Sequence, residues 1–118
     1  MAKLYFNFST MNAGKSTLLL QAAHNYSERG QTPFLLTAHH DTRAGQGRIA
    51  SRIGLSKEAV TFAPDTDLFA LIETAHRAQP IDCVFLDEAQ FLTKAQVWEL
   101  ARVADDLGLP VMTYGLRV

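Results

Sequence analysis

The segment "STMNAGKST", which begins at Ser9, constrains the fold more than any other stretch of these 118 residues. Its first eight residues match the phosphate-binding pattern G-x-x-x-x-G-K-[ST] at every fixed position but the first, where Ser9 replaces glycine. The apolar run Leu4–Phe8 precedes the segment, and Ser16–Arg29 follows as a Leu- and Ala-rich stretch without internal Gly or Pro. The sequence therefore predicts a strand, a phosphate loop and a helix in the order that nucleotide binding requires.

Further apolar runs alternate with helical patterns along the rest of the chain. Four of these runs predict strands, at Pro33–Ala38, Val60–Ala63, Cys83–Leu86 and Pro110–Tyr114. Because the runs are apolar throughout and helices separate them, they favour a parallel sheet with helices on both faces. We expect a single α/β domain spanning residues 1–118.

Two more helices are predicted between these strands. Asp67–Ala78 places its apolar residues on one face, and a capping box of Thr93 and Gln96 begins a helix that ends at Gly108. The polar stretch "HHDTRAGQGR" is typical of a loop, and Ile49–Leu55 indicates neither helix nor strand.

Composition excludes several classes of protein for this chain. With a net charge of −1 and 47% hydrophobic residues, the chain lacks the basic excess of nucleic-acid-binding proteins. It has neither an apolar stretch near the ~20 residues of a membrane span nor a secretory signal. The single cysteine, Cys83, can form neither an internal disulfide nor a zinc site by itself. These features favour a cytoplasmic protein without a membrane partner.

An acidic pair follows the predicted strand Cys83–Leu86. Asp87 and Glu88 therefore lie at a carboxyl strand end, where ligands bind in sheets of this kind. There Asp87 can hold Mg²⁺ through water and Glu88 can act as a general base. In the phosphate loop, Lys15 would bridge the outer phosphates of ATP and the Ser16 hydroxyl would bind Mg²⁺.

The remaining polar features leave alternatives open. An arginine in "HHDTRAG" can reach a phosphate from the same sheet edge, whereas His39 and His40 show no metal-ligand spacing. The acidic box "DEAQ" also allows a helicase, although helicases need a second lobe and basic surfaces. A nucleotide-switched interaction module without a small-molecule acceptor is the third reading.

The chain resembles the N-terminal part of bacterial thymidine kinases of the tetrameric, RecA-like class. The similar segments are "LYFNFSTMNAGKST", "HDTRAGQGRIASRIGLS", "FLDEAQFLT" and "PVMTYGLR", which together cover nearly the whole chain. This family accepts a small residue other than glycine at the position of Ser9. The resemblance implies ATP-dependent phosphorylation of the 5′-hydroxyl of thymidine or deoxyuridine, in a homotetramer. It also implies that the strand Pro110–Tyr114 lies between the strands Leu4–Phe8 and Cys83–Leu86.

The resemblance also implies the roles of individual residues. It assigns ATP binding to Ser9, Thr10, Met11, Asn12, Ala13, Gly14, Lys15, Ser16, Thr17, Asp87, Glu88 and Gln90. Glu88 would take the proton of the 5′-hydroxyl, and Asp41 and Arg43 would lie near the transferred phosphoryl group. Met11, Phe91 and Leu116 would line the thymine pocket. Arg52 matches a family motif without an assigned role.

Members of this family continue past the position of Val118. Their continuation carries a cysteine-bound structural zinc and a long loop that closes over thymidine, and neither is found in these 118 residues. We therefore expect a truncated kinase core for which no zinc is predicted. Such a core alone should transfer phosphate poorly, because part of its acceptor site is missing.

Overall fold

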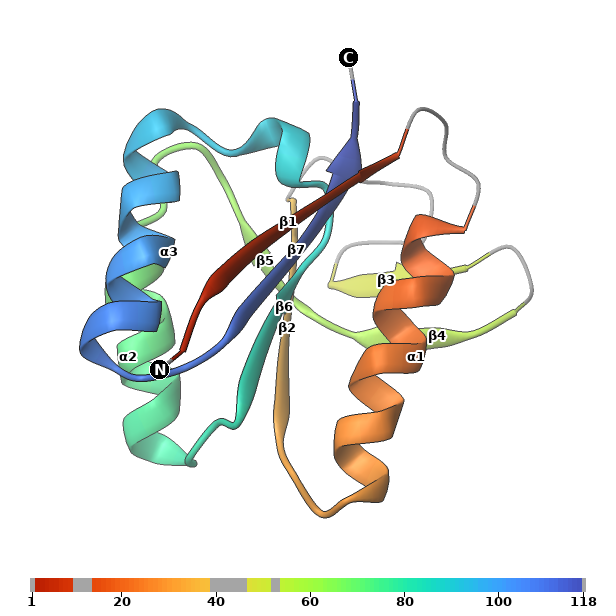
Figure 1. The fold of residues 1–118 in the computed structure, drawn as a ribbon. Coiled ribbons are helices and arrows are strands. Elements are labelled where there is room, and N and C mark those ends of the chain that lie inside the picture. The colour runs from red at the N-terminus through yellow and green to blue at the C-terminus, as the bar shows by residue number, and fades with distance from the viewer. Residues whose placement is uncertain (1, 10–13, 39–46, 52–53, 118) are drawn as a thin grey trace.

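The computed structural model describes residues 2–9, 14–38, 47–51 and 54–117, and Figure 1 shows how its elements are arranged. The helices of this part of the chain are α1 (Lys15–Glu28), α2 (Leu68–Ala78), the short 3₁₀ helix η1 (Ala89–Phe91) and α3 (Lys94–Asp106). The strands are β1 (Leu4–Ser9), β2 (Pro33–Ala38), β3 (Arg48–Ala50), β4 (Ser56–Glu58), β5 (Val60–Phe62), β6 (Cys83–Leu86) and β7 (Val111–Leu116). No helix among the described residues is both long enough and apolar enough to cross a membrane.

The main sheet of the described residues has the strand order β1-β7-β6-β2-β5, and every neighbouring pair is parallel. Strand β7 thus lies between β1 and β6, which confirms the predicted position of the strand near Pro110–Tyr114. The α/β class and the parallel sheet are confirmed as well. Since all strands run the same way, their carboxyl ends meet at one edge, where β1 ends next to the start of α1 (Figure 1).

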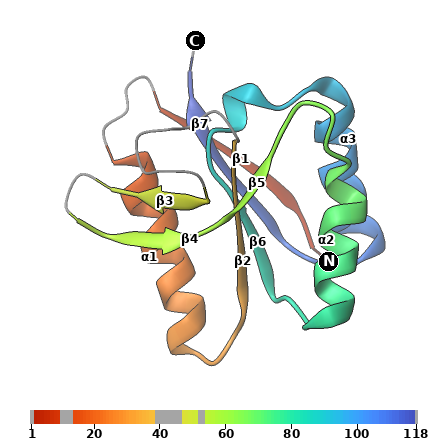
Figure 2. The same cartoon turned by 180° about the vertical axis from the view of Figure 1, so that it is seen from behind.

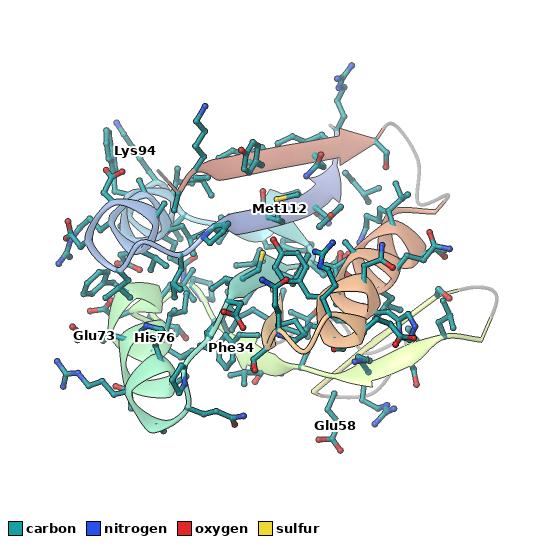
Figure 3. The ribbon with its side chains drawn as sticks, turned by 60° about the horizontal axis from the view of Figure 1, so that its bottom comes forward. Phe34, Glu58, Glu73, His76, Lys94 and Met112 are labelled. Atoms are coloured by element: carbon teal, nitrogen blue, oxygen red, sulfur yellow. The ribbon has the colours of Figure 1, made fainter. Side chains whose placement is uncertain are left out.

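Helices cover both faces of this sheet, as the apolar strands predicted. Helix α1 packs on one face through Leu19, Leu20 and Ala23, and α2 and α3 pack on the other (Figures 1 and 3). Strand residues alternate between the two cores: Phe85 belongs to the α1 side, and Leu86 belongs to the side of α2 and α3. This alternation decides which side chains can meet at the end of each strand.

The segment that gave no clear pattern, Ile49–Leu55, contributes to a small antiparallel hairpin. Strands β3 and β4 pair with each other, and the hairpin lies beside α1 (Figure 2). Ile49 is the buried apolar residue of β3, and it joins the core beneath α1. A three-residue strand with one buried side chain is too short to produce a recognisable alternation.

Strand β1 forms one edge of the sheet, and much of its side-chain surface faces solvent. Tyr5, Phe6 and Phe8 are exposed, and the rings of Phe6 and Phe8 stack with their centroids 5.9 Å apart. This edge is the most apolar exposed part of the described sheet. The apolar pattern of Leu4–Phe8 predicts a buried strand, because such a pattern contains no information about which strand lies at the edge of the sheet.

One buried glutamine ties the start of α3 to the segment before α2. The Gln96 Oε1 atom accepts a hydrogen bond from the Thr93 backbone N–H at 3.0 Å, and the Thr93 hydroxyl accepts one from the Gln96 N–H at 3.1 Å. The predicted capping box is therefore confirmed. In addition, Gln96 Nε2 donates to the carbonyl oxygens of Ala63 and Thr66, at 2.7 and 3.1 Å. This side chain satisfies three backbone groups at once.

We predict that Gln96→Ala lowers the free energy of unfolding by about 2–4 kcal/mol, because three hydrogen bonds of a buried side chain are lost. Gln96→Glu should destabilise the protein as well, since a carboxylate cannot donate to the two carbonyl groups. Denaturant titration measures both changes, with Gln21→Ala on the exposed surface of α1 as the control. A Gln96→Ala variant as stable as the control would contradict this role.

Candidate active site

The site begins at the turn between β1 and α1. Gly14 has a left-handed backbone with φ of 83°, a conformation that side chains other than hydrogen strongly disfavour. This turn places Lys15 at the first position of α1, where its side chain is almost completely buried with 3% exposure. A buried ammonium needs anionic partners, and the carboxyl end of β6 provides them.

Lys15 lies between the two acidic residues that follow β6. Its Nζ atom is 2.7 Å from Asp87 Oδ1 and also contacts Glu88 Oε1. Asp87 and Glu88 are themselves buried, so one ammonium group is shared by two carboxylates in a region with little water. Lys15 and Ser16, the described end of the phosphate-binding motif, thus meet the acidic strand end at one sheet edge, as predicted.

Asp87 has further hydrogen bonds that fix its orientation. Its Oδ2 atom accepts a hydrogen bond from the Ser16 hydroxyl at 3.1 Å, and its Oδ1 atom accepts one from the Glu88 N–H at 2.9 Å. The Asp87 backbone N–H donates to the Leu36 carbonyl on β2 at 2.8 Å. The adjacent Ser16 and Asp87 oxygens are hard donors of the kind that Mg²⁺ prefers, so this pair fits a magnesium ion.

Glu88 has an unusual backbone. With φ of 62° it is the one non-glycine residue in the left-handed region among the described residues. A glutamate in this region costs free energy that the surrounding contacts must offset, and such residues cluster at functional sites. The turn directs the chain from β6 into η1, and it brings the Glu88 carboxylate back to Lys15.

Gln90 connects Glu88 to the end of β7. Its Nε2 atom donates to Glu88 Oε2 at 3.1 Å, and its Oε1 atom accepts from the Leu116 N–H at 3.0 Å. This contact requires Gly115, because a Cβ atom there would lie 3.0 Å from Gln90 Oε1 and 2.9 Å from Phe8 Cε1. We did not anticipate Gly115 from the sequence, although a glycine inside a strand pattern is itself a sign of close backbone approach.

Two titratable groups lie in the core between the sheet and α1. Burial raises the pKa of the Cys83 thiol to about 11, and burial likewise raises the pKa of the Tyr114 hydroxyl. Both groups are therefore uncharged at neutral pH. They add no charge to the core on the α1 side of the sheet.

The other predicted site residues divide into two groups. Ser9 ends β1 paired with Leu116, in strand backbone that does not require glycine. Thr17 is half-buried in the first turn of α1, Leu116 is half-buried, and the Phe91 ring is 43% exposed at the end of η1. Predicted residues outside the described part of the chain are Thr10, Met11, Asn12, Ala13, Asp41, Arg43 and Arg52.

No group of three His, Cys, Asp or Glu side chains that could hold a metal ion is found among the described residues. A magnesium site here needs fewer than three such side chains, because a protein commonly binds this ion through one or two side chains together with substrate phosphates and water. Asp87 and Ser16 match that pattern.

Comparison with known proteins agrees with this geometry. The family model described as "Thymidine kinase" matches residues 2–118. A thymidine kinase of Ruegeria pomeroyi is 65% identical over 118 residues, which are all of this chain and 60% of that protein. Thymidine kinases of Jannaschia sp. and Agrobacterium fabrum are 64% and 63% identical, over 100% and 99% of this chain and 60% and 61% of their own lengths. The chain thus spans about 60% of the length of these relatives, and it belongs to the thymidine kinase family.

Proposed function

We propose that the protein transfers the γ-phosphoryl group of ATP to the 5′-hydroxyl of thymidine or deoxyuridine, and that residues 1–118 form the kinase core. The observation that carries this proposal is the position of Lys15 between Asp87 and Glu88 at the carboxyl edge of the sheet. Family membership supports the choice of acceptor. The homotetramer and the cytoplasmic location implied by the resemblance stay predictions.

In this proposal, Lys15 exchanges its carboxylate partners for phosphate groups when ATP binds. Without ATP, its single positive charge pairs with both buried carboxylates. When ATP enters, the β- and γ-phosphates offer a denser negative charge, and the lysine side chain turns to them. Because two carboxylates then lose their counter-ion, they become available for cation binding and proton transfer.

Asp87 and Ser16 would hold the magnesium ion, Ser16 directly and Asp87 through water. When bound, this ion neutralises charge on the β- and γ-phosphate oxygens. The Ser16 hydroxyl already lies 3.1 Å from Asp87 Oδ2, so both oxygens face the same small volume. The backbone hydrogen bond from Asp87 to Leu36 on β2 keeps the carboxylate at the sheet edge.

Glu88 would act as the general base. As the 5′-oxygen forms its bond to the γ-phosphorus, the bond from that phosphorus to the β,γ-bridging oxygen breaks and ADP leaves. The hydroxyl proton passes to the Glu88 carboxylate. Gln90 donates a hydrogen bond to Oε2 of this carboxylate, and Oε1, which contacts Lys15 in this structure, would be the atom that accepts the proton once Lys15 turns to the phosphates.

The remaining roles follow from the resemblance. Asp41 and Arg43 would lie near the transferred phosphoryl group, where a guanidinium group stabilises the charge of the transition state. Met11, Phe91 and Leu116 would contact the thymine ring. The exposed Phe91 ring and the bond between Leu116 and Gln90 support this placement, because they put apolar surface beside Glu88.

We predict that Lys15→Ala weakens binding of MgATP by about 1.5–3 kcal/mol, or roughly 10- to 150-fold, because a charge-assisted contact to phosphate is lost. Titration calorimetry on the complete gene product measures this change, and Lys94→Ala on the exposed start of α3 is the matched control. A circular dichroism spectrum checks that the variant is folded, since its two buried carboxylates lose their partner. Equal affinities for the two variants would show that Lys15 does not bind phosphate.

We predict that the two acidic residues differ in their effects. Glu88→Gln should keep MgATP affinity and lose phosphoryl transfer by roughly 10²–10⁴-fold, the usual range for a general base. Asp87→Asn should weaken binding that depends on Mg²⁺ as well. Radiolabelled transfer to thymidine and calorimetry separate the two outcomes.

Normal transfer by Glu88→Gln would show that the base is another group. ATP hydrolysis that RNA stimulates and thymidine does not affect would favour the helicase alternative raised by "DEAQ".

A further inference from the structure

Thr37 on β2 is a buried polar residue to which neither the motifs nor the proposed mechanism assign a role. Its residue exposure is 1%, and its Oγ1 atom has no hydrogen-bond partner among the described residues. A buried hydroxyl without a partner lowers the stability of a fold, because it has lost its hydrogen bonds to water. Valine has nearly the same shape and equal suitability for a strand, so a packing role alone does not account for the hydroxyl.

The sheet register places Thr37 beside Asp87. Leu36 on β2 is paired with Leu86 on β6, and the next residues along the two strands are Thr37 and Asp87. The Asp87 N–H donates to the Leu36 carbonyl, so the parallel pairing continues to this point. Neighbouring strands are about 4.8 Å apart, which puts the two side chains next to each other if they share a face of the sheet.

Both side chains belong to the α1 face. Leu36 and Leu86 pack in the core beneath α2 and α3, whereas Leu35 and Phe85 pack beneath α1. Because successive strand residues point to opposite faces, Thr37 follows Leu35 and Asp87 follows Phe85 on the α1 side. This is the side from which Lys15 and Ser16 reach Asp87.

The Asp87 carboxylate already has other partners in this arrangement. Lys15 and the Glu88 N–H bind Oδ1, and the Ser16 hydroxyl binds Oδ2, while no bond joins Asp87 to Thr37 in the described structure. The Thr37 hydroxyl therefore lies beside the predicted magnesium ligand and is not satisfied by it. A water molecule between the Thr37 hydroxyl and the Asp87 carboxylate would form a hydrogen bond with each, since a water can bridge polar groups at little cost.

We propose that Thr37 is a positioning residue, whose hydroxyl holds against Asp87 a water of the shell that accompanies MgATP. This inference rests on the proposed function, because Asp87 must be a magnesium ligand through water. Without nucleotide the hydroxyl has no hydrogen-bond partner among the described residues, so it should not add to the stability of the fold. In the nucleotide-bound state it contributes a hydrogen bond to binding.

The test compares Thr37→Val with Thr61→Val, a matched control. Thr61 is paired with Thr37 on the neighbouring strand β5, on the same face but one strand farther from Asp87. Denaturant unfolding without nucleotide and calorimetry with a non-hydrolysable ATP analogue, with and without Mg²⁺, are measured for the complete gene product. Thr37→Ser keeps the hydroxyl and serves as the rescue variant.

We expect Thr37→Val to be at least as stable as the parent protein without nucleotide. The gain in ATP affinity that Mg²⁺ brings should fall by about 3- to 10-fold, in keeping with one hydrogen bond. Affinity without Mg²⁺ should not change, Thr61→Val should bind like the parent protein, and Thr37→Ser should recover most of the magnesium effect.

A destabilised Thr37→Val variant with the full magnesium effect would overturn the inference and leave the proposed function intact, because the hydroxyl would then be structural. If the parent protein itself gains no ATP affinity from Mg²⁺, both the inference and the assignment of Asp87 are wrong.

Discussion

The contact of Lys15 with Asp87 and Glu88 is the interaction on which the rest of the site depends. Burying these three charges is costly, and the attraction of the ammonium group for the two carboxylates offsets the cost only in a well-fixed geometry. Helix α1 fixes the lysine and strand β6 fixes the acids. In the proposed mechanism, the phosphates of ATP take the ammonium group and release the carboxylates.

The surrounding backbone holds the two carboxylates in different ways. Asp87 is held by the N–H of its neighbour and by the β2 ladder, so it is rigid and suited to binding a cation. Glu88 lies in a disfavoured turn and is held through Gln90, which reaches the end of β7 because Gly115 has no side chain. Packing of β7 between β1 and β6 therefore bears directly on the proposed base.

Much of the fold and part of the site could be predicted from the sequence, because local patterns determine these features. The bounds of Pro33–Ala38 and Cys83–Leu86, the capping box at Thr93 and the meeting of Lys15 with the acidic strand end all follow from motifs or periodicity. The rest depends on which strands become neighbours. The pairing of β6 with β7 brings Gln90, in η1 after β6, to Leu116, and the register of β2 and β6 brings Thr37 to Asp87. Neither pair can be found without the strand order.

The most direct test of the account is a crystal structure of the complete gene product with Mg²⁺ and a non-hydrolysable ATP analogue. The account predicts that Lys15 Nζ lies within hydrogen-bond distance of β- or γ-phosphate oxygens and has left Glu88, whose carboxylate then faces the acceptor side. A triphosphate bound elsewhere, with Lys15 still held between Asp87 and Glu88, would contradict it.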